Sequence, residues 1–82
     1  MTNEAKYNKE LSIQKTEEFF KKNGINKTLD EMYDDYFEEK KTKEMKWLKN
    51  YLKDKVYGRS PNPYHIYNWF YYYNGIPEWA EN

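Results

Sequence analysis

Cysteine is absent from this chain of 82 residues, and histidine occurs only once, as His65. The absence of cysteine excludes a disulfide framework, a thiolate metal site and a cysteine nucleophile. One histidine cannot form a multi-histidine metal site. The sequence contains no run of 18 or more apolar residues, so no membrane-spanning helix is expected. The N-terminus lacks the apolar region of a secretory signal, and we therefore expect a cytoplasmic location.

Aliphatic side chains are also scarce, with only four Leu and one Val. Aromatic side chains are abundant instead: ten Tyr, four Phe and three Trp. They must supply much of the core of a chain that is long enough for one small domain. That number is more than so small a core can hide, so several tyrosines are expected at the surface. An AT-rich genome alone would also produce a chain rich in Lys, Asn and Tyr.

The spacing of apolar residues predicts a mostly α-helical, single small domain over residues 1–82, folded as a three- to four-helix bundle. The first helix is expected to begin near Ala5 and to end before Gly24, which can supply a left-handed stop. Two prolines forbid a continuous helix through the linker that follows residue 59. We expect frayed residues at 1–4, helices near 5–23, 28–40, 42–57 and 63–73, and a proline-containing linker at 60–63.

The helix expected near 28–40 has the clearest start signal, because Thr28 and Glu31 can form a capping box. Its predicted core stripe comprises Leu29, Met32, Tyr33, Tyr36 and Phe37. The opposite, solvated face is expected to carry Asp30, Glu31, Asp34, Asp35, Glu38 and Glu39.

The next apolar stripe is out of phase with this one by roughly 140° at about 100° per residue. It comprises Met45, Leu48, Tyr51, Leu52 and Val56. The phase difference favours a break within 40–43, with Thr42 capping a new helix, over one long helix that shows different faces to different neighbours.

The aromatic segment after Pro63 allows two structures. Asn62 and Pro63 form a good helix start, and Asn74 with Gly75 forms a good stop. The same Asn-Gly pair could instead turn a hairpin that pairs 64–73 with 76–80. Pro77 in the return strand counts against the hairpin, so we favour a helix, after which Trp79 would fold back as a hydrophobic plug.

The expected core is drawn from all four predicted helices. Its members are Leu11, Phe20, Leu29, Met32, Phe37, Leu48, Leu52, Ile66 and Phe70.

Charge is uneven although fourteen basic and fourteen acidic residues cancel. Residues 1–39 hold ten acids and six bases, whereas residues 40–59 hold eight bases and two acids. We expect the acidic and basic helices to pair across an antiparallel turn, through individually weak surface ion pairs. The alternative is that the basic helix exposes a phosphate-binding face formed by Lys43, Lys46, Lys49, Lys53 and Arg59.

Catalytic patterns are not found in this sequence. The acids at 30–39 are expected on a solvated helix face rather than in a cleft, and His65 has no acid near it in sequence. Ser12 and Ser60 lack a nucleophile-elbow context, and the three glycines form no phosphate-cradling loop. We therefore expect a protein that is not an enzyme and that needs no cofactor or metal.

A nucleic-acid-binding regulator is one hypothesis for function. Segments 56–60, 66–69 and 75–77 have a small turn, an apolar residue three before a Trp, and a Gly-x-Pro element. In this the chain resembles the end of Cro-type helix-turn-helix repressors. Pro61 and Pro63 lengthen the turn, however, and the helix that would read bases carries no Arg, Lys or Gln.

A protein-binding module is the favoured hypothesis, because Tyr and Trp dominate interface hot spots. Seven of them fall within residues 64–79, more than one short helix can bury. The composition resembles that of small accessory proteins of phages and mobile elements, which implies an inhibitor or adaptor that acts on a host enzyme, nucleic-acid enzyme complex or defence system, as anti-CRISPR proteins do. A homodimer is the remaining possibility for a protein partner. The expected contact residues are Tyr67, Tyr71, Tyr72 and Trp79.

Overall fold

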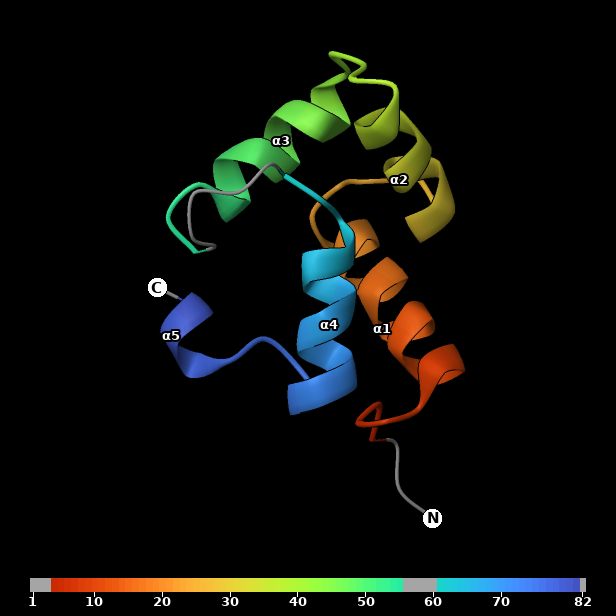
Figure 1. Ribbon diagram of the computed structural model, residues 1–82, viewed down its shortest axis with the longest axis vertical. Helices are drawn as coiled ribbons and strands as arrows, with labels where there is room; N and C mark the ends of the chain where they lie inside the picture. The colour runs from red at the N-terminus through yellow and green to blue at the C-terminus, as the bar shows by residue number, and fades with distance from the viewer. Residues whose placement is uncertain (1–3, 56–60, 82) are drawn as a thin grey trace.

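The computed structural model describes residues 4–55 and 61–81. In these ranges all regular secondary structure is helical, and no strand is formed. The described chain forms five helices in a small all-α bundle (Figure 1). The predicted fold class is confirmed, and the alternative of an aromatic hairpin is wrong, because 64–73 is a helix. The helices are α1 (Lys9–Lys22), α2 (Leu29–Phe37), α3 (Lys43–Leu52), α4 (Tyr64–Tyr73) and the short α5 (Glu78–Glu81).

Helix α1 begins four residues later than the sequence predicts. Tyr7 has a left-handed backbone, with φ of 61°, which interrupts a right-handed helix. Asn8 then caps the helix, since its side-chain oxygen accepts a hydrogen bond from the Leu11 N–H at 2.9 Å. The other end matches the prediction: the helix stops at Lys22, and Gly24 adopts a φ of 82°.

Both predicted caps around α2 and α3 are confirmed. The Glu31 N–H donates to the Thr28 hydroxyl at 3.1 Å, and the Thr28 N–H donates to the Glu31 carboxylate at 2.9 Å. The break between the two helices is also real, because Thr42 caps α3 by accepting from the Met45 N–H at 3.1 Å. Helix α2 ends at Phe37 instead of 40, and Glu39 takes a positive φ of 55°.

The C-terminal part follows the prediction closely. Helix α4 begins at Tyr64, one residue later than predicted, so Pro63 and not Asn62 is the N-cap residue. The Tyr64 N–H donates to the Asn62 side chain at 2.9 Å. The helix ends at Asn74, which is left-handed with φ of 61°. In α5 it is Ala80 that is buried, whereas the predicted plug, Trp79, is 59% exposed. The described part of α3 ends at Leu52, and the prediction that it reaches 57 involves residues outside the described ranges.

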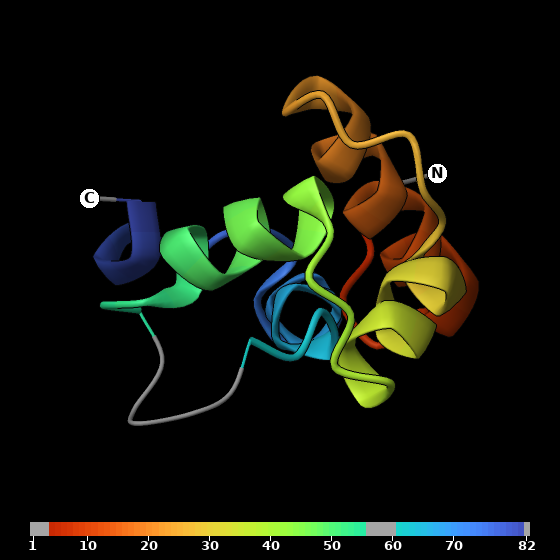
Figure 2. The same cartoon turned by 90° about the horizontal axis from the view of Figure 1, so that it is seen from above.

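Helix α4 lies at the centre of the bundle. It runs beside α1, with which it makes the most extensive contact, while α2 packs on α3 and on the end of α1. Seen from above, α1, α2 and α3 surround α4 on three sides (Figure 2). None of these three helices lies on the remaining side of α4 in this view.

The core is built from Phe20, Leu29, Met32, Leu48, Leu52 and Ile66, as predicted, all of them buried. Three predicted members are wrong: Leu11 and Phe70 are only half-buried, and Phe37 is 73% exposed.

A rotation of α2 about its axis explains the exposure of Phe37. This helix turns Asp35 inward with Leu29 and Met32. At roughly 100° per residue, Phe37 lies about 80° around the helix from Leu29, on the side away from Asp35, and therefore points outward. The burial of Asp35 also corrects the prediction that it lies on the solvated face. The Asp35 carboxylate forms ion pairs with Lys27 and, at 4.0 Å, with Lys40.

Candidate protein-binding surface

Helix α4 has two faces of different chemistry. Ile66 and Trp69 point into the core. Tyr64, Tyr67 and Tyr71 follow one another at helical spacing on another face, where they are only half-buried. Their rings form a continuous row, because Tyr64 and Tyr67 lie 5.4 Å apart and Tyr67 stacks on Tyr71 at 5.7 Å between centroids.

The row continues across to α2. The ring of Tyr33 meets the ring of Tyr64 edge to face, with centroids 5.2 Å apart. Phe37, one turn further along α2, stacks on Tyr33 at 6.4 Å. Two helices that are far apart in the sequence thus present one surface of aromatic rings.

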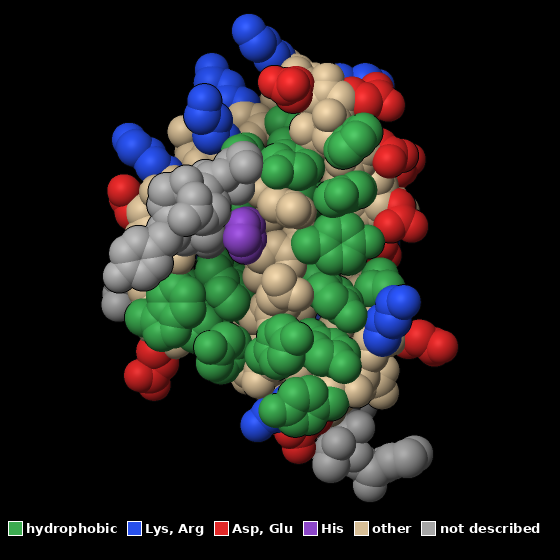
Figure 3. Space-filling view, in the orientation of Figure 1, with side chains coloured by type: hydrophobic (Ala, Val, Ile, Leu, Met, Phe, Trp, Pro, Cys, Tyr) green, Lys and Arg blue, Asp and Glu red, His purple; other side chains and the backbone are tan. Residues whose placement is uncertain are grey.

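At its other end the row reaches the first residues of the chain. Tyr72 packs edge-on against Tyr71 at 5.0 Å, and the ring of Tyr7 contacts both at 5.8 and 6.4 Å. Figure 3 shows these hydrophobic side chains as an almost unbroken band along one face. We call this surface the aromatic strip, and it consists of Tyr7, Tyr33, Phe37, Tyr64, Tyr67, Tyr71 and Tyr72.

The position of Tyr7 is fixed by hydrogen bonds around it. Its N–H donates to the carbonyl of Tyr71 at 2.7 Å. The N–H of Ala5, a fully buried residue, donates to the Asn74 side chain. The Ser12 hydroxyl contacts the carbonyls of Ala5 and Asn8. These contacts hold a bulky residue in the left-handed region, which is energetically costly and occurs where neighbouring structure enforces it.

Two tyrosines of the aromatic strip have raised pKa values. Burial raises the pKa of Tyr64 above its ordinary value of 10.0, and the hydrogen bond from its hydroxyl to Asp30, at 3.2 Å, raises it further. Burial, together with the neighbouring hydroxyls of Tyr71 and Tyr72, likewise raises the pKa of Tyr67. Segment 61–77 contains no Lys, Arg, Asp or Glu. The α4 part of the strip therefore offers ring faces and hydroxyl groups, with no acidic or basic side chain from this segment.

The structure separates the four residues that the sequence predicts as contacts. Tyr67, Tyr71 and Tyr72 lie together in the strip. Trp79 belongs to a different group of rings, because it packs edge-on against Trp69 at 5.7 Å. Trp69 contacts Tyr51, which in turn stacks on Trp47.

Sequence reasoning missed four members of the strip. One of them is Tyr64. Its spacing from Tyr67 and Tyr71 places all three on one helix face, and this spacing could have identified it. The apolar pattern predicts Tyr33 and Phe37 in the core. In the structure the buried face of α2 includes Asp35 instead, and the apolar pattern gives no sign of this. Nothing local in the sequence connects Tyr7 to Tyr71.

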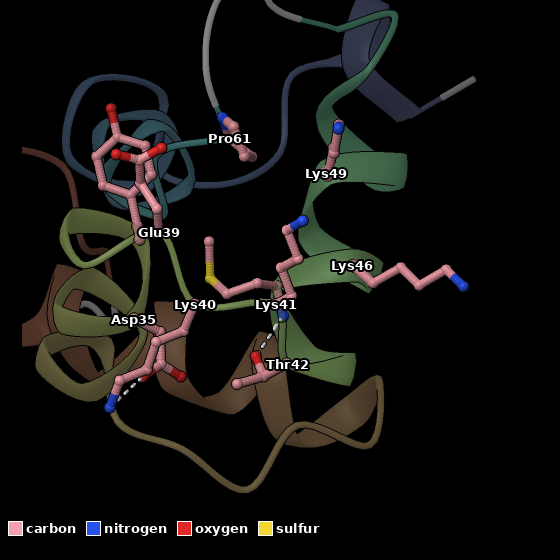
Figure 4. Close-up of a pocket in the computed structure, with 10 residues that line it drawn as sticks. Asp35, Glu39, Lys40, Lys41, Thr42, Lys46, Lys49 and Pro61 are labelled. Atoms are coloured by element: carbon pink, nitrogen blue, oxygen red, sulfur yellow. Dashed lines mark hydrogen bonds and ion pairs between the residues drawn. The ribbon is translucent and has the colours of Figure 1, made fainter.

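The predicted phosphate-binding lysines line the exposed side of α3. Lys43, Lys46, Lys49 and Lys53 are all exposed, whereas Arg59 lies outside the described residues. Lys46 and Lys49 border a groove of about 450 Å³ between α2 and α3, together with Lys40, Lys41 and Pro61 (Figure 4). In this view Lys46 extends away from Asp35 and Lys40.

The expected pairing of the acidic and basic helices is not formed. Within 4–55 and 61–81, Asp35 of α2 pairs with Lys27 and Lys40, and Glu38, just after α2, also pairs with Lys40. Lys40 precedes α3, and none of these ion pairs includes a lysine of α3. Asp35, which lines the groove between the two helices, already has its partners in Lys27 and Lys40. The α3 lysines are thus left open to solvent.

The described ranges contain neither a metal-binding cluster nor a membrane-spanning helix. No group of three or more His, Asp or Glu side chains there is placed to hold a metal ion. None of the described helices has the length and apolar character needed to cross a membrane.

Comparisons of this chain with protein-family models, with curated proteins and with solved structures gave no match.

Proposed function

We propose that this chain is a non-enzymatic protein-binding module whose contact surface is the aromatic strip. One observation carries the proposal: rings from α2, α4 and the segment before α1 form one continuous row along a face of the described molecule. Exposed aromatic surfaces of this kind on small proteins mark interaction sites.

The chemistry of the strip suits a protein partner. Tyrosine provides a large, stiff contact area with a hydroxyl group at its rim, and it loses little conformational entropy on binding. Tyr7, Phe37 and Tyr72 are 66%, 73% and 53% exposed and form the outer contacts. Tyr64, Tyr67 and Tyr71 are half-buried and already ordered by their neighbours, which lowers the cost of binding.

We extend the proposal to an inhibitor or adaptor that works by occupying a surface of its partner. The small size and the composition, which resemble those of phage and mobile-element accessory proteins, support a host enzyme or defence complex as the target. On this proposal the protein acts in the cytoplasm of a bacterial host.

A photo-crosslinking pair tests the proposal. A benzoylphenylalanine at position 72 lies in the strip, whereas one at position 50, an exposed Asn on α3, does not. We expect position 72 alone to capture a protein from the host cells. Equal capture at both positions, or capture at neither, would contradict the proposal.

The captured protein is then purified and titrated with two matched variants. Tyr72→Ala removes a strip residue, and Tyr73→Ala removes an adjacent tyrosine of similar exposure, 61%, that lies outside the strip. We expect Tyr72→Ala to weaken binding by about thirtyfold, the loss of about 2 kcal/mol that is typical of a hot spot. Tyr73→Ala should bind as wild type does, and both variants should keep the wild-type melting temperature.

Nucleic-acid binding is the second candidate function, favoured by the unpaired lysines of α3. Lys46→Glu combined with Lys53→Glu should abolish binding of DNA or RNA, and wild-type affinity should fall steeply with salt. Lys21→Glu with Lys22→Glu, exposed on α1, provides a control of equal charge. Equal losses in both double variants, or an affinity indifferent to salt, would exclude a lysine-driven site on α3.

A further inference from the structure

The aromatic strip has an acidic edge. Asp30 lies against it, because its carboxylate accepts the hydrogen bond from the Tyr64 hydroxyl at 3.2 Å. Asp34 follows one helical turn later on the same exposed side of α2 and is adjacent in sequence to Tyr33. Across 4–55 and 61–81, neither carboxylate has a Lys, Arg or His nitrogen within 4.0 Å. Two negative charges therefore border the rings without a cation of their own.

A group of basic side chains lies on the side of the molecule opposite this edge. Figure 3 shows acidic side chains beside the upper part of the strip and basic side chains on the opposite upper side of the molecule. Those bases include the exposed lysines of α3. A cationic partner would therefore be attracted toward the α2 side of the strip and repelled from the α3 side, which fixes its orientation.

The rings themselves also favour cations. A guanidinium or ammonium group placed over a tyrosine face is attracted by the negative face of the ring. One such contact already exists at the end of the strip, where the Lys6 ammonium lies 5.5 Å from the centroid of the Tyr7 ring. Arginine suits this surface better than lysine, because its planar group can stack on a ring while its N–H groups bind a carboxylate.

We propose that the aromatic strip and its acidic edge recognise an arginine-bearing basic segment of a protein. In this arrangement guanidinium groups stack on the rings of Tyr33, Tyr64 and Tyr67 and pair with Asp30 and Asp34. The inference rests on the proposed function, and it specifies the chemistry of the partner that the strip selects.

A titration with a fluorescent nona-arginine peptide, in low salt, tests the charge part of the inference. We expect the wild-type protein to bind it and Asp30→Asn with Asp34→Asn to bind about tenfold more weakly, through loss of two ion pairs. The control Glu18→Gln with Glu78→Gln changes the same charge at exposed positions on α1 and α5 and should bind as wild type does. A nona-lysine peptide should bind more weakly than nona-arginine.

Two substitutions at one ring test the stacking part. Tyr67→Phe keeps the ring and should retain binding, whereas Tyr67→Leu removes it and should lower affinity several-fold. Circular dichroism confirms that both variants fold, and a Tyr67→Leu protein that fails to fold is replaced by Tyr33→Leu.

Several results would overturn the inference: absence of binding, equal weakening in the site and control double variants, or full binding without the ring. Self-association detected by sedimentation and lost in the Tyr72→Ala variant would also do so, because a second copy would then be the occupant. If crosslinking at position 72 captures a partner while nona-arginine fails to bind, the proposed function stands and only the basic chemistry is wrong.

Discussion

The backbone N–H of Tyr7 donates to the carbonyl oxygen of Tyr71 at 2.7 Å, and their rings meet edge to face with centroids 5.8 Å apart. The last carbonyls of a helix have no partner within it. The N-terminal segment therefore completes the end of α4 and at the same time adds a ring to the aromatic strip. The first described residues therefore form part of this surface.

Asn74 secures this contact from the other side. It is left-handed, and its side chain accepts the hydrogen bond from the Ala5 N–H. Asn74→Gly tolerates the conformation but loses the bond, so it should lower the free energy of unfolding by about 1 kcal/mol. Asn74→Ala also strains the backbone and should cost about 2–3 kcal/mol. Urea denaturation measures both, and equal costs would show that the left-handed conformation is not maintained.

Leu48 tests the packing of α3. Its side chain is fully buried in the core shared with Phe20 and Ile66. Leu48→Ala should cost about 2–5 kcal/mol through the cavity it leaves. Phe37→Ala, which removes a larger but 73% exposed side chain, should change stability by less than about 0.5 kcal/mol. Thermal denaturation compares the melting temperatures of the two variants. An unchanged melting temperature for Leu48→Ala would contradict the packing of α3.

The helices were predictable because their signals are local. A capping box needs only Thr28 and Glu31 at the right spacing, and the phase shift that places a break before Thr42 is visible in the apolar pattern. The late start of α1 was not predictable. It depends on the left-handed Tyr7, and that conformation is imposed by contacts with Tyr71 and Asn74 more than sixty residues away.

The candidate site was predicted only in part, because contacts between residues distant in the sequence decide which rings come together. The α4 tyrosines follow from helical spacing, so Tyr67 and Tyr71 fall on one face. Which rings of α2 join them depends on how that helix is rotated, and in the observed rotation Asp35 turns inward and pairs with Lys27. Ion pairs between distant residues are not visible in an apolar periodicity. Trp79 lies apart from the strip because it packs on Trp69, and its role as a contact residue stays a prediction.

Tyr64 provides a titration test of the acidic edge. Burial is the main cause of its raised pKa, and the hydrogen bond to Asp30 is the second. Asp30→Asn should therefore lower the pKa of Tyr64 but leave it above 10.0. Asp34→Asn, which removes a charge without removing that hydrogen bond, should have a smaller effect. Ring signals followed by NMR across the alkaline range measure both, and identical shifts would exclude the Asp30 contact.

Lys27 links the ion pair at Asp35 to stability at high pH. The hydrogen bond to Asp35 is the main cause that raises the pKa of Lys27 above its ordinary 10.5, so the folded state favours the charged ammonium more than the unfolded state does. The resulting stabilisation is complete below pH 10.5 and is lost as pH rises through the higher pKa of the folded protein.

Ionisation of tyrosines also lowers stability as pH rises, because the pKa values of Tyr64 and Tyr67 are raised in the folded protein. An arginine at position 27 separates the contribution of Lys27 from this tyrosine contribution. Lys27→Arg keeps a cation beside Asp35 throughout the alkaline range. From about pH 9 to about pH 11.5, urea midpoints should therefore fall less for Lys27→Arg than for wild type. Lys22→Arg, at an exposed position on α1, should follow wild type. If Lys27→Arg falls as steeply as wild type, the pair with Asp35 does not stabilise the folded state, and another contact must hold α2 in the rotation that exposes Tyr33 and Phe37.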